Sequence, residues 1–191
     1  MKINFLVLAV CALWVSSEVL LVVTKRSQKG QAKAADRGSQ KLLWATILIS
    51  ITIAVLAQRG DVGAVPGLRS LWDIIGQVLI AGGLAIRWAA ILTLKDFFTV
   101  DIAIVPDQRI IDRGIYRFIR HPSYTGSLIS FLGLGITFAN WLSILAIIIP
   151  ITGAFLYRVR IEEAELHRAF GDEYAAYVQR TRRFVPFLFL A

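Results

Sequence analysis

The sequence has very few of the residues that build disulfides and zinc sites. Among its 191 residues it has one cysteine, Cys11, and two histidines, His121 and His167. One cysteine excludes an internal disulfide and any metal site that needs several cysteine ligands. The two histidines do not form a His-x-x-x-His zinc pattern, so we expect no metal cofactor. The sequence also shows no obvious Ser-His-Asp set, internal repeat or low-complexity tract.

Charged residues are scarce as well. Asp, Glu, Lys and Arg make up 18% of the chain, whereas 57% of it is hydrophobic, and the mean hydropathy is +0.65. A soluble domain of this length would expose too much apolar surface, so the composition predicts a membrane protein with one domain. The net charge of +8 would also suit nucleic acid. In so apolar a chain, basic loops that face the cytoplasm explain that charge better, and we expect no nucleic-acid partner.

Long apolar runs predict an all-α integral membrane protein with five transmembrane helices. The first three helices are expected at about residues 3–24, 42–57 and 71–93. The fourth apolar run, residues 125–157, is too long for one crossing and is interrupted at 139–141. It therefore predicts a helical hairpin with arms at about 125–138 and 141–157. The run at 42–57 and both hairpin arms are short for a full crossing at about 1.5 Å per residue.

Basic residues indicate how these helices are oriented. Lys and Arg occur six times in 25–41, five times in 95–120 and six times after residue 157, but only twice in 58–70. Five crossings with the N-terminus outside place all three basic segments in the cytoplasm. Residues 1–24 are interpreted as a retained helix and not as a signal peptide, because the apolar run is long and its basic residues follow it. We expect a bacterial inner-membrane protein whose active site faces the cytoplasm.

The stretch GIYRFIRHPSYTGS, residues 114–127, gathers polar side chains just before an apolar run. Pro122 disfavours helical geometry at His121 and itself suits the first turn of a helix, so His121 is expected at a helix entrance. The unpaired N–H groups and the positive dipole there would accept a carboxylate or a phosphate. Tyr124 adds a ring and a hydroxyl. The alternative interpretation is an interfacial belt that only anchors the helix end.

A second group of charges, Arg158, Glu162 and Glu163, follows the last apolar run. Arg158 and Glu162 are four residues apart and share a helix face. Arg158 lies near the predicted membrane boundary, where an unpaired charge is costly and needs a partner. The two residues form either an ion pair that caps a membrane helix or a polar pair that faces the same pocket as His121 and Tyr124.

Two further charges, Glu18 and Arg87, lie inside apolar runs near the predicted cytoplasmic end. Snorkelling to the interface is one explanation of both, and a position in the site is the other. The tail after residue 157 has amphipathic spacing, with a break expected at Gly171 and an end at Pro186. We expect this tail to close over the pocket as a helical lid.

Two stretches, GIYRFIRHPSYTG (114–126) and RVRIEEAELHRAFGDEYAAY (158–177), together resemble the isoprenylcysteine carboxyl methyltransferase family and its bacterial and archaeal relatives. The resemblance covers about residues 94–187. It implies a division into transmembrane helices at 1–93 and a methyltransferase region at 94–191. It also implies a membrane enzyme that uses S-adenosyl-L-methionine.

The resemblance implies roles for individual residues. The residues that would bind the cofactor are His121, Pro122, Tyr124, Gly126 and Glu163, with the glycine allowing a close approach of the cofactor. The residues that would lie nearer the acceptor and act in catalysis are Arg158 and Glu162.

The resemblance further implies a small lipophilic acceptor that enters from the bilayer between the helices, most simply a carboxylate of isoprenylcysteine type. A carboxylate is already ionised near neutral pH, so its methylation needs no general base, and Arg158 would hold it. A thiol or amine acceptor would need deprotonation by Glu162 or His121. Two other functions stay open at this point: an NADPH-dependent reductase of the sterol-reductase type, and a non-catalytic scaffold that binds anionic lipid.

Overall fold

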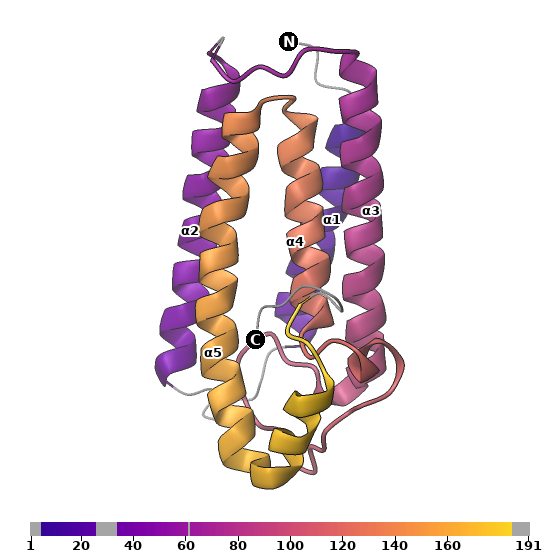
Figure 1. Ribbon diagram of the computed structural model, residues 1–191, viewed down its shortest axis with the longest axis vertical. Helices are drawn as coiled ribbons and strands as arrows, with labels where there is room; N and C mark the ends of the chain where they lie inside the picture. The colour runs from indigo at the N-terminus through magenta and orange to yellow at the C-terminus, as the bar shows by residue number, and fades with distance from the viewer. Residues whose placement is uncertain (1–4, 26–33, 61, 185–191) are drawn as a thin grey trace.

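The computed structural model describes residues 5–25, 34–60 and 62–184, and the regular structure in these ranges is helical. Its helices are, in chain order, α1 (Phe5–Thr24), α2 (Ala34–Gln58), α3 (Arg69–Leu94), the short 3-10 helices η1 (Lys95–Phe97) and η2 (Gly114–Arg117), α4 (Pro122–Thr137) and α5 (Trp141–Arg180). The five α-helices stand side by side in an elongated bundle (Figure 1). The predicted all-α class is confirmed.

The bundle is built from two closely packed helix pairs. α3 lies against α4 and α2 lies against α5, while α4 and α5 are joined as a hairpin and α1 touches α3 (Figure 1). The turns between α2 and α3 and between α4 and α5 lie at the upper end in that view, and the last part of α5 lies at the lower end. The lower end is where the long connections and the tail of the chain come together.

The α3–α4 contact is close because glycines face each other across it. A Cβ atom added at Gly83 would collide with the backbone of Gly126, and one added at Gly76 would collide with the backbone of Gly133. Residues seven apart return to the same helix face after two turns, so the two pairs lie along one line. Small residues of this kind let two helix backbones approach in a membrane. The open side of Gly126 therefore faces α3, so the structure gives this glycine a role in helix packing, and its approach to a cofactor stays a prediction.

The α4–α5 hairpin has the tight turn that the sequence predicts. α4 ends at Thr137 and α5 begins at Trp141. Asn140 caps α5, since its Oδ1 accepts the backbone N–H of Ser143 at 3.1 Å and its Nδ2 donates to the Val62 carbonyl at 3.0 Å. A side-chain cap of this kind satisfies an N–H group that the first helical turn leaves free. The same residue thereby ties the hairpin turn to the α2–α3 loop.

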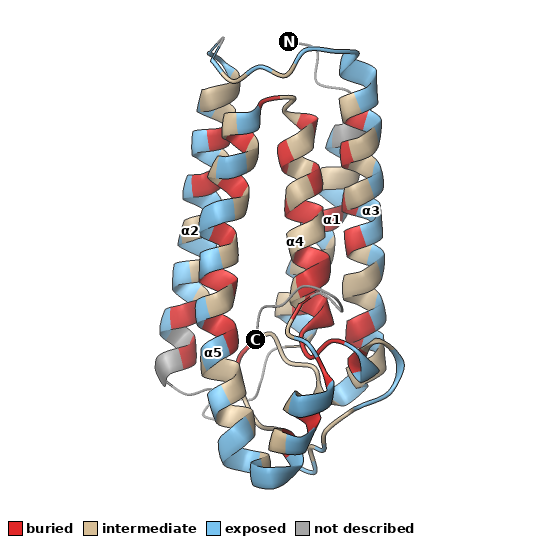
Figure 2. Ribbon diagram, viewed as in Figure 1, coloured by how far each residue is buried: buried red, intermediate tan, exposed pale blue. Residues whose placement is uncertain are grey.

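A buried apolar core fills the middle of the bundle and takes residues from all five helices. Its members are Trp14, Ala54, Ile80, Phe131, Ile147, Ile151 and Phe155. Buried positions concentrate on α4 and on the inner side of α5, whereas much of the outer surface of α2 and α3 is exposed (Figure 2). Large apolar side chains such as Leu48 and Val78 lie on that exposed surface. An outer surface of this composition suits contact with lipid.

Three helical segments in the described part of the chain are long and apolar enough to cross a membrane. They are Gly38–Gln58, Arg69–Phe97 and Trp141–Arg180. The described apolar part of α1, Leu8–Thr24, is shorter, and α4 has 16 residues. At about 1.5 Å per residue, α4 is about 24 Å long, so its predicted shortness is confirmed.

The predicted start of the second helix is wrong. α2 begins at Ala34 and not near residue 42, so the polar residues before the apolar run belong to the same helix. Asp36 lies in its first turn, where a negative charge suits the helix dipole. The segment that the sequence assigned to a basic loop is therefore partly helix.

The last predicted membrane helix continues directly into the predicted amphipathic tail helix. α5 does not end near residue 157 but continues to Arg180, because the following residues include strong helix formers and no proline. The break predicted at Gly171 is confirmed, since this glycine has φ 51° and ψ −123° inside the long helix. Pro186, the predicted end of the tail, lies outside the described residues.

The described parts of the three basic segments share the lower end of the bundle. Lys25, just after α1, donates through Nζ to the Lys95 carbonyl at 3.0 Å, and the Val100 N–H donates to the Lys25 carbonyl at 2.9 Å. Arg158 of α5 pairs with Asp36 of α2 at 2.7 Å. The charge pattern therefore predicts correctly that these segments meet at one end.

Candidate active site

His121 and Pro122 begin α4, as the sequence predicts. Pro122 is the first helical residue, and His121 precedes it with φ −123° and ψ 56°. The backbone N–H of His121 donates to the Arg183 carbonyl at 3.1 Å, and Thr125 Oγ1 donates to the Phe184 carbonyl at 2.6 Å. Carbonyl oxygens of the chain's own tail thus contact the residue before α4 and a side chain of its first turn.

The tail folds back and pairs with the segment before α4. Residues 181–184 run beside residues 118–121 as an isolated parallel bridge. The Arg120 N–H donates to the Arg182 carbonyl at 2.7 Å, and the Arg182 N–H donates to the Phe118 carbonyl at 3.0 Å. Backbone hydrogen bonds therefore anchor the tail over this end of the bundle, in the place predicted for the lid.

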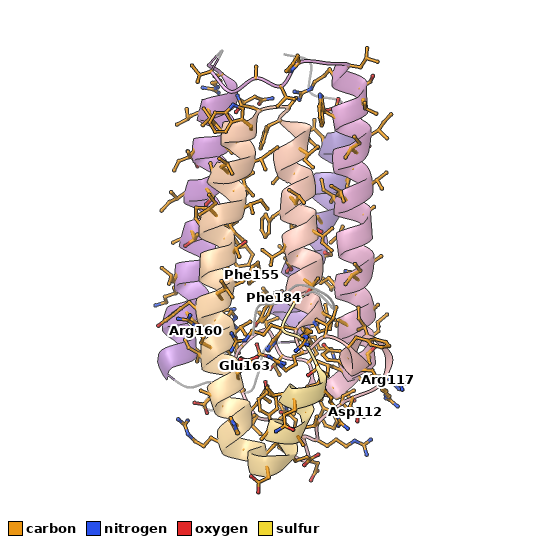
Figure 3. All side chains as sticks on the ribbon, viewed as in Figure 1. Asp112, Arg117, Phe155, Arg160, Glu163 and Phe184 are labelled. Atoms are coloured by element: carbon orange, nitrogen blue, oxygen red, sulfur yellow. The ribbon has the colours of Figure 1, made fainter. Side chains whose placement is uncertain are left out.

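Ion pairs centred on Glu163 strengthen this anchor. Arg120 Nε lies 3.0 Å from Glu163 Oε1, Arg183 Nη2 lies 2.7 Å from Oε2, and His121 Nε2 lies 3.3 Å from Oε1. We call these four residues the Glu163 cluster. Figure 3 places Glu163 between α5 and the returning tail. Its hydrogen bond raises the pKa of the Arg183 guanidinium, because the carboxylate favours the charged form.

Glu162, one residue earlier, has a different environment. Tyr124 Oη donates to Glu162 Oε2 at 2.8 Å, and His121 Nδ1 lies 3.7 Å from Glu162 Oε1. The rings of His121 and Tyr124 stack with centroids 5.7 Å apart. The Glu162 side chain is 30% exposed, whereas that of Glu163 is 13% exposed. Glu162 is thus the more open of the two carboxylates.

Arg158 takes a partner from another helix, not Glu162. Its Nη1 donates to Asp36 Oδ1 at 2.7 Å and to Ser39 Oγ at 2.9 Å, both on α2. Its Nη2 donates to the Val100 carbonyl at 2.7 Å, and its Nε donates to Tyr124 Oη at 3.2 Å. The structure therefore contradicts the simple intrahelical ion pair and supports a polar group shared by several segments.

Glu18 and Arg87 also meet, although they are 69 residues apart in the chain. Arg87 Nε and Nη2 each lie 2.7 Å from one oxygen of Glu18. Arg87 Nη1 donates to Ser123 Oγ at 2.8 Å and to Ser127 Oγ at 3.1 Å. This two-pronged ion pair ties α1 and α3 to the first turns of α4, so snorkelling to the interface does not describe either side chain.

These groups surround a cavity of about 560 Å³ that reaches from the lower end into the bundle. Its charged and phenolic lining includes Glu18, Arg87, Tyr116, Arg120, His121, Tyr124, Arg158, Glu162, Tyr174 and Tyr177. Its apolar lining includes Cys11, Trp14, Ile47, Ile51, Phe131 and Leu134. The cavity is therefore polar near the tail and apolar along α1, α2 and α4.

The fold and this site match a known enzyme family. A model of the isoprenylcysteine carboxyl methyltransferase family matches residues 72–168, which comprise most of α3, all of α4 and the part of α5 that carries both glutamates. The chain belongs to this family. The matched region begins before residue 94, so the family likeness includes a helix that the sequence motifs left out.

Individual relatives extend the match further along the chain. Protein-S-isoprenylcysteine O-methyltransferase B of Arabidopsis thaliana is 32% identical over 164 residues, which are 81% of this chain and 83% of the relative. A probable protein-S-isoprenylcysteine O-methyltransferase of Oryza sativa subsp. indica is 32% identical over 165 residues, which are 81% of this chain and 86% of the relative.

A solved structure shares the fold. The eukaryotic intramembrane Ras methyltransferase of the isoprenylcysteine carboxyl methyltransferase family superposes with a TM-score of 0.66 and 25% sequence identity. The match covers 95% of this chain but 65% of the solved one, so this chain spans just under two thirds of its length. This isoprenylcysteine carboxyl methyltransferase family member is thus an integral membrane protein, and enzymes of its family use S-adenosyl-L-methionine as methyl donor.

Four of the seven residues singled out from the family motifs line the cavity. They are His121, Tyr124, Arg158 and Glu162. The other three lie beside it: Pro122 is fully buried in the first turn of α4, Gly126 faces α3, and Glu163 is in the Glu163 cluster. The resemblance therefore found the right stretches, but it did not separate residues of the cavity wall from residues that support it.

Sequence reasoning missed two residues of the site and left two unresolved. It assigned Asp36 to a loop and Tyr174 only to an amphipathic pattern, and it left Glu18 and Arg87 between two explanations. Tyr174 lines the cavity, and its buried hydroxyl has no hydrogen-bond partner among the described residues. For Glu18 and Arg87, the sequence signal was a charge inside an apolar run, because such a charge is stable in a membrane helix only when it has a partner.

Proposed function

We propose that this methyltransferase transfers the methyl group of S-adenosyl-L-methionine to the carboxylate of an isoprenylcysteine-type acceptor. The observation that carries the proposal is one cavity with a charged end beside Tyr124, Glu162 and Arg158 and an apolar end among α1, α2 and α4. Such a shape suits an acceptor with an ionised head and an isoprenoid tail. The names of the plant relatives, both protein-S-isoprenylcysteine O-methyltransferases, support the same acceptor class.

The polar end fits the cofactor. S-adenosyl-L-methionine is a cation at its sulfonium, and the half-open carboxylate of Glu162 offers a negative charge to balance it. The unpartnered hydroxyl of Tyr174 would gain a hydrogen bond from a polar group of the bound cofactor. We assign cofactor binding to Glu162, Tyr174, His121 and Tyr124, with Pro122 fixing the turn that presents the last two.

Arg158 is well placed to hold the acceptor but has little hydrogen-bonding capacity left. An arginine has five N–H groups, and the described contacts of Arg158 use four of them. One N–H therefore remains for the acceptor carboxylate. We assign Arg158 the role of orienting that carboxylate through this single donor and its charge.

Methyl transfer to a carboxylate requires that the donor and the acceptor be aligned, and it does not require proton transfer. The bound donor supplies an electrophilic methyl group. The acceptor carboxylate is ionised near neutral pH, so no residue has to remove a proton. The anchored tail covers the charged end and limits access of water, and the apolar wall holds the isoprenoid. Such positioning supplies several kcal/mol of the barrier reduction in reactions of this type.

We further propose that the chain crosses the membrane five times with its N-terminus outside. Three described segments have the length and composition of spans, and the shorter α1 and α4 stand in the same bundle. The basic segments meet at the end that carries the charged part of the cavity. That end would face the cytoplasm, where the cofactor is available.

Thermal unfolding and methyl transfer in detergent test this function. S-adenosylhomocysteine should raise the melting temperature, and S-farnesyl-N-acetylcysteine should become a methyl ester when S-adenosyl-L-methionine is added. The matched control is the carboxamide of the same farnesyl compound, which keeps the tail but replaces the ionised carboxylate with an uncharged amide. Stabilisation by NADPH alone would favour the reductase, and no stabilisation by either compound would contradict the proposal.

A further inference from the structure

The ion pair between Asp36 and Arg158 links the start of α2 to α5 at the charged end of the cavity. Both side chains are buried, with 1% of Asp36 and 3% of Arg158 exposed. Ser39 joins them, because its hydroxyl accepts from Arg158 Nη1 at 2.9 Å and lies 3.3 Å from Asp36 Oδ1, to which it donates. The paired residues are 122 positions apart, so only the packing of α2 on α5 brings them together.

Fold stability alone is a weak reason for this pair. Removing two charges from water costs free energy that their attraction often fails to recover, and apolar replacements of buried ion pairs are frequently as stable. Asp36 adds to that cost, since its Oδ2 is buried and has no hydrogen-bond partner among the described residues. A role in the site accounts better for a charge placed here.

Arg158 has a second anion within reach along its own helix. Glu162 lies one turn further on the same face, a spacing at which arginine and glutamate pair readily. In the structure a hydroxyl separates the two charges, because Tyr124 Oη accepts from Arg158 Nε at 3.2 Å and donates to Glu162 Oε2 at 2.8 Å. If Asp36 lost its charge, Glu162 would be an anion that the guanidinium could reach along its own helix.

We propose that Asp36 is a positioning residue that keeps the charge of Arg158 away from Glu162. The inference rests on the proposed function, in which the Glu162 carboxylate balances the sulfonium of the donor. With Arg158 held by Asp36, Glu162 keeps its negative charge for that cation. S-adenosylhomocysteine lacks the sulfonium charge, so it gains much less from Glu162.

The difference between these two compounds provides the test. Asp36→Asn keeps the shape of the side chain and removes its charge. We expect the preference for S-adenosyl-L-methionine over S-adenosylhomocysteine, measured as a ratio of Kd values by calorimetry in detergent, to fall about fivefold to tenfold. A merely structural loss would weaken both compounds together and leave this ratio unchanged.

Two further variants control the interpretation. Asp73→Asn makes the same change in another buried acid, which pairs with Arg69 at 3.5 Å on α3, and it should leave the ratio unchanged. In an Arg158→Gln background, Asp36→Asn should no longer alter the ratio, because no guanidinium remains to approach Glu162.

Each outcome decides the inference. An unchanged ratio in Asp36→Asn, or an equal fall in Asp73→Asn, would overturn it and leave the proposed function intact. Failure of the wild-type protein to bind either compound would overturn the proposed function together with this inference. If Asp36→Asn does not fold, Ser39→Ala decides instead. It should lower the ratio about twofold, since it removes one hydrogen-bond acceptor of Arg158 and leaves the Asp36 charge in place. No change in the ratio would reject the role.

Discussion

Glu162 and Glu163 are neighbours in the chain, yet they belong to two different regions of the molecule. Glu162 lies in the cavity wall, where a tyrosine hydroxyl donates to it at 2.8 Å and the ring of His121 lies 3.7 Å away. Glu163 lies in the Glu163 cluster, where Arg120 and Arg183 approach it to 3.0 and 2.7 Å. Successive residues on an α-helix point about 100° apart, so one step along α5 changes most of the partners, and His121 is the residue that contacts both acids.

The difference teaches how a pair of identical acids serves two purposes. A carboxylate between two guanidinium groups is already compensated, so it holds the tail against α4 and has little attraction left for a ligand. A carboxylate held by a hydroxyl keeps most of its charge, so it is available to a cation in the cavity. The four predictions below test this division, beginning with the largest expected effect.

The largest effect is expected from Glu162→Gln. The amide keeps the size of the side chain but removes the charge that we assign to the sulfonium. We expect kcat/KM for methyl transfer to fall roughly 100-fold, with little change in melting temperature. Initial rates with a radiolabelled methyl donor measure this. A Glu162→Gln variant that keeps wild-type rates would contradict the assignment of Glu162 to the cofactor and Glu163 to the anchor.

Glu163→Gln should instead act first on stability. It removes the negative charge that Arg183 and the buried Arg120 contact, and we expect a loss of about 3 kcal/mol in the free energy of unfolding. Thermal unfolding and limited proteolysis of the tail measure this, with Glu173→Gln as a control at an exposed acid of the same tail. Full stability combined with lost activity would contradict the assignment of Glu163 to the anchor.

A change on α3, at a position away from both glutamates, tests the helix packing that holds Tyr124 in place. Gly83→Ala would drive a methyl group into the backbone of Gly126, and we expect it to cost about 2 kcal/mol. Gly82→Ala is the matched control, because nothing lies within 4 Å of the added atom. Melting temperatures of the two variants make the comparison. Equal melting temperatures would show that α3 and α4 are less closely packed than described.

Tyr124→Phe should give the smallest effect of the four. It removes the hydroxyl between Arg158 and Glu162 and leaves both charges, and we expect kcat/KM to fall about fivefold, as for one lost hydrogen bond. Tyr157→Phe is the control, since this tyrosine of α5 is 49% exposed. A loss as large as that of Glu162→Gln would mean that the hydroxyl contributes more than spacing and hydrogen bonding.

The predictions that hold depend on chemistry within a few residues. Pro122 starts a helix because it lacks an N–H group, and Gly171 breaks one because it adopts a positive φ at low cost. The predicted helical hairpin holds because its arms are apolar and Asn140 lies at the turn. The two motif stretches led to the right family because their residues lie close together in the chain.

The predictions that fail depend on partners far apart in the chain. Asp36 was assigned to a basic loop, since no residue near it in the sequence indicates that Arg158 is its partner. The packing of Gly126 against Gly83 was missed, since this contact is visible only when α3 and α4 are placed together. In each case the deciding neighbour lies on another helix.

By itself, the sequence determined the membrane class, the succession of five helices, the short hairpin and the family motifs, because hydropathy and turn residues act over one turn or one span. The tertiary structure alone decided which glutamate opens to the cavity and which acid holds Arg158. Both choices depend on the rotation of α5 against α2 and α4, and long-range packing sets that rotation.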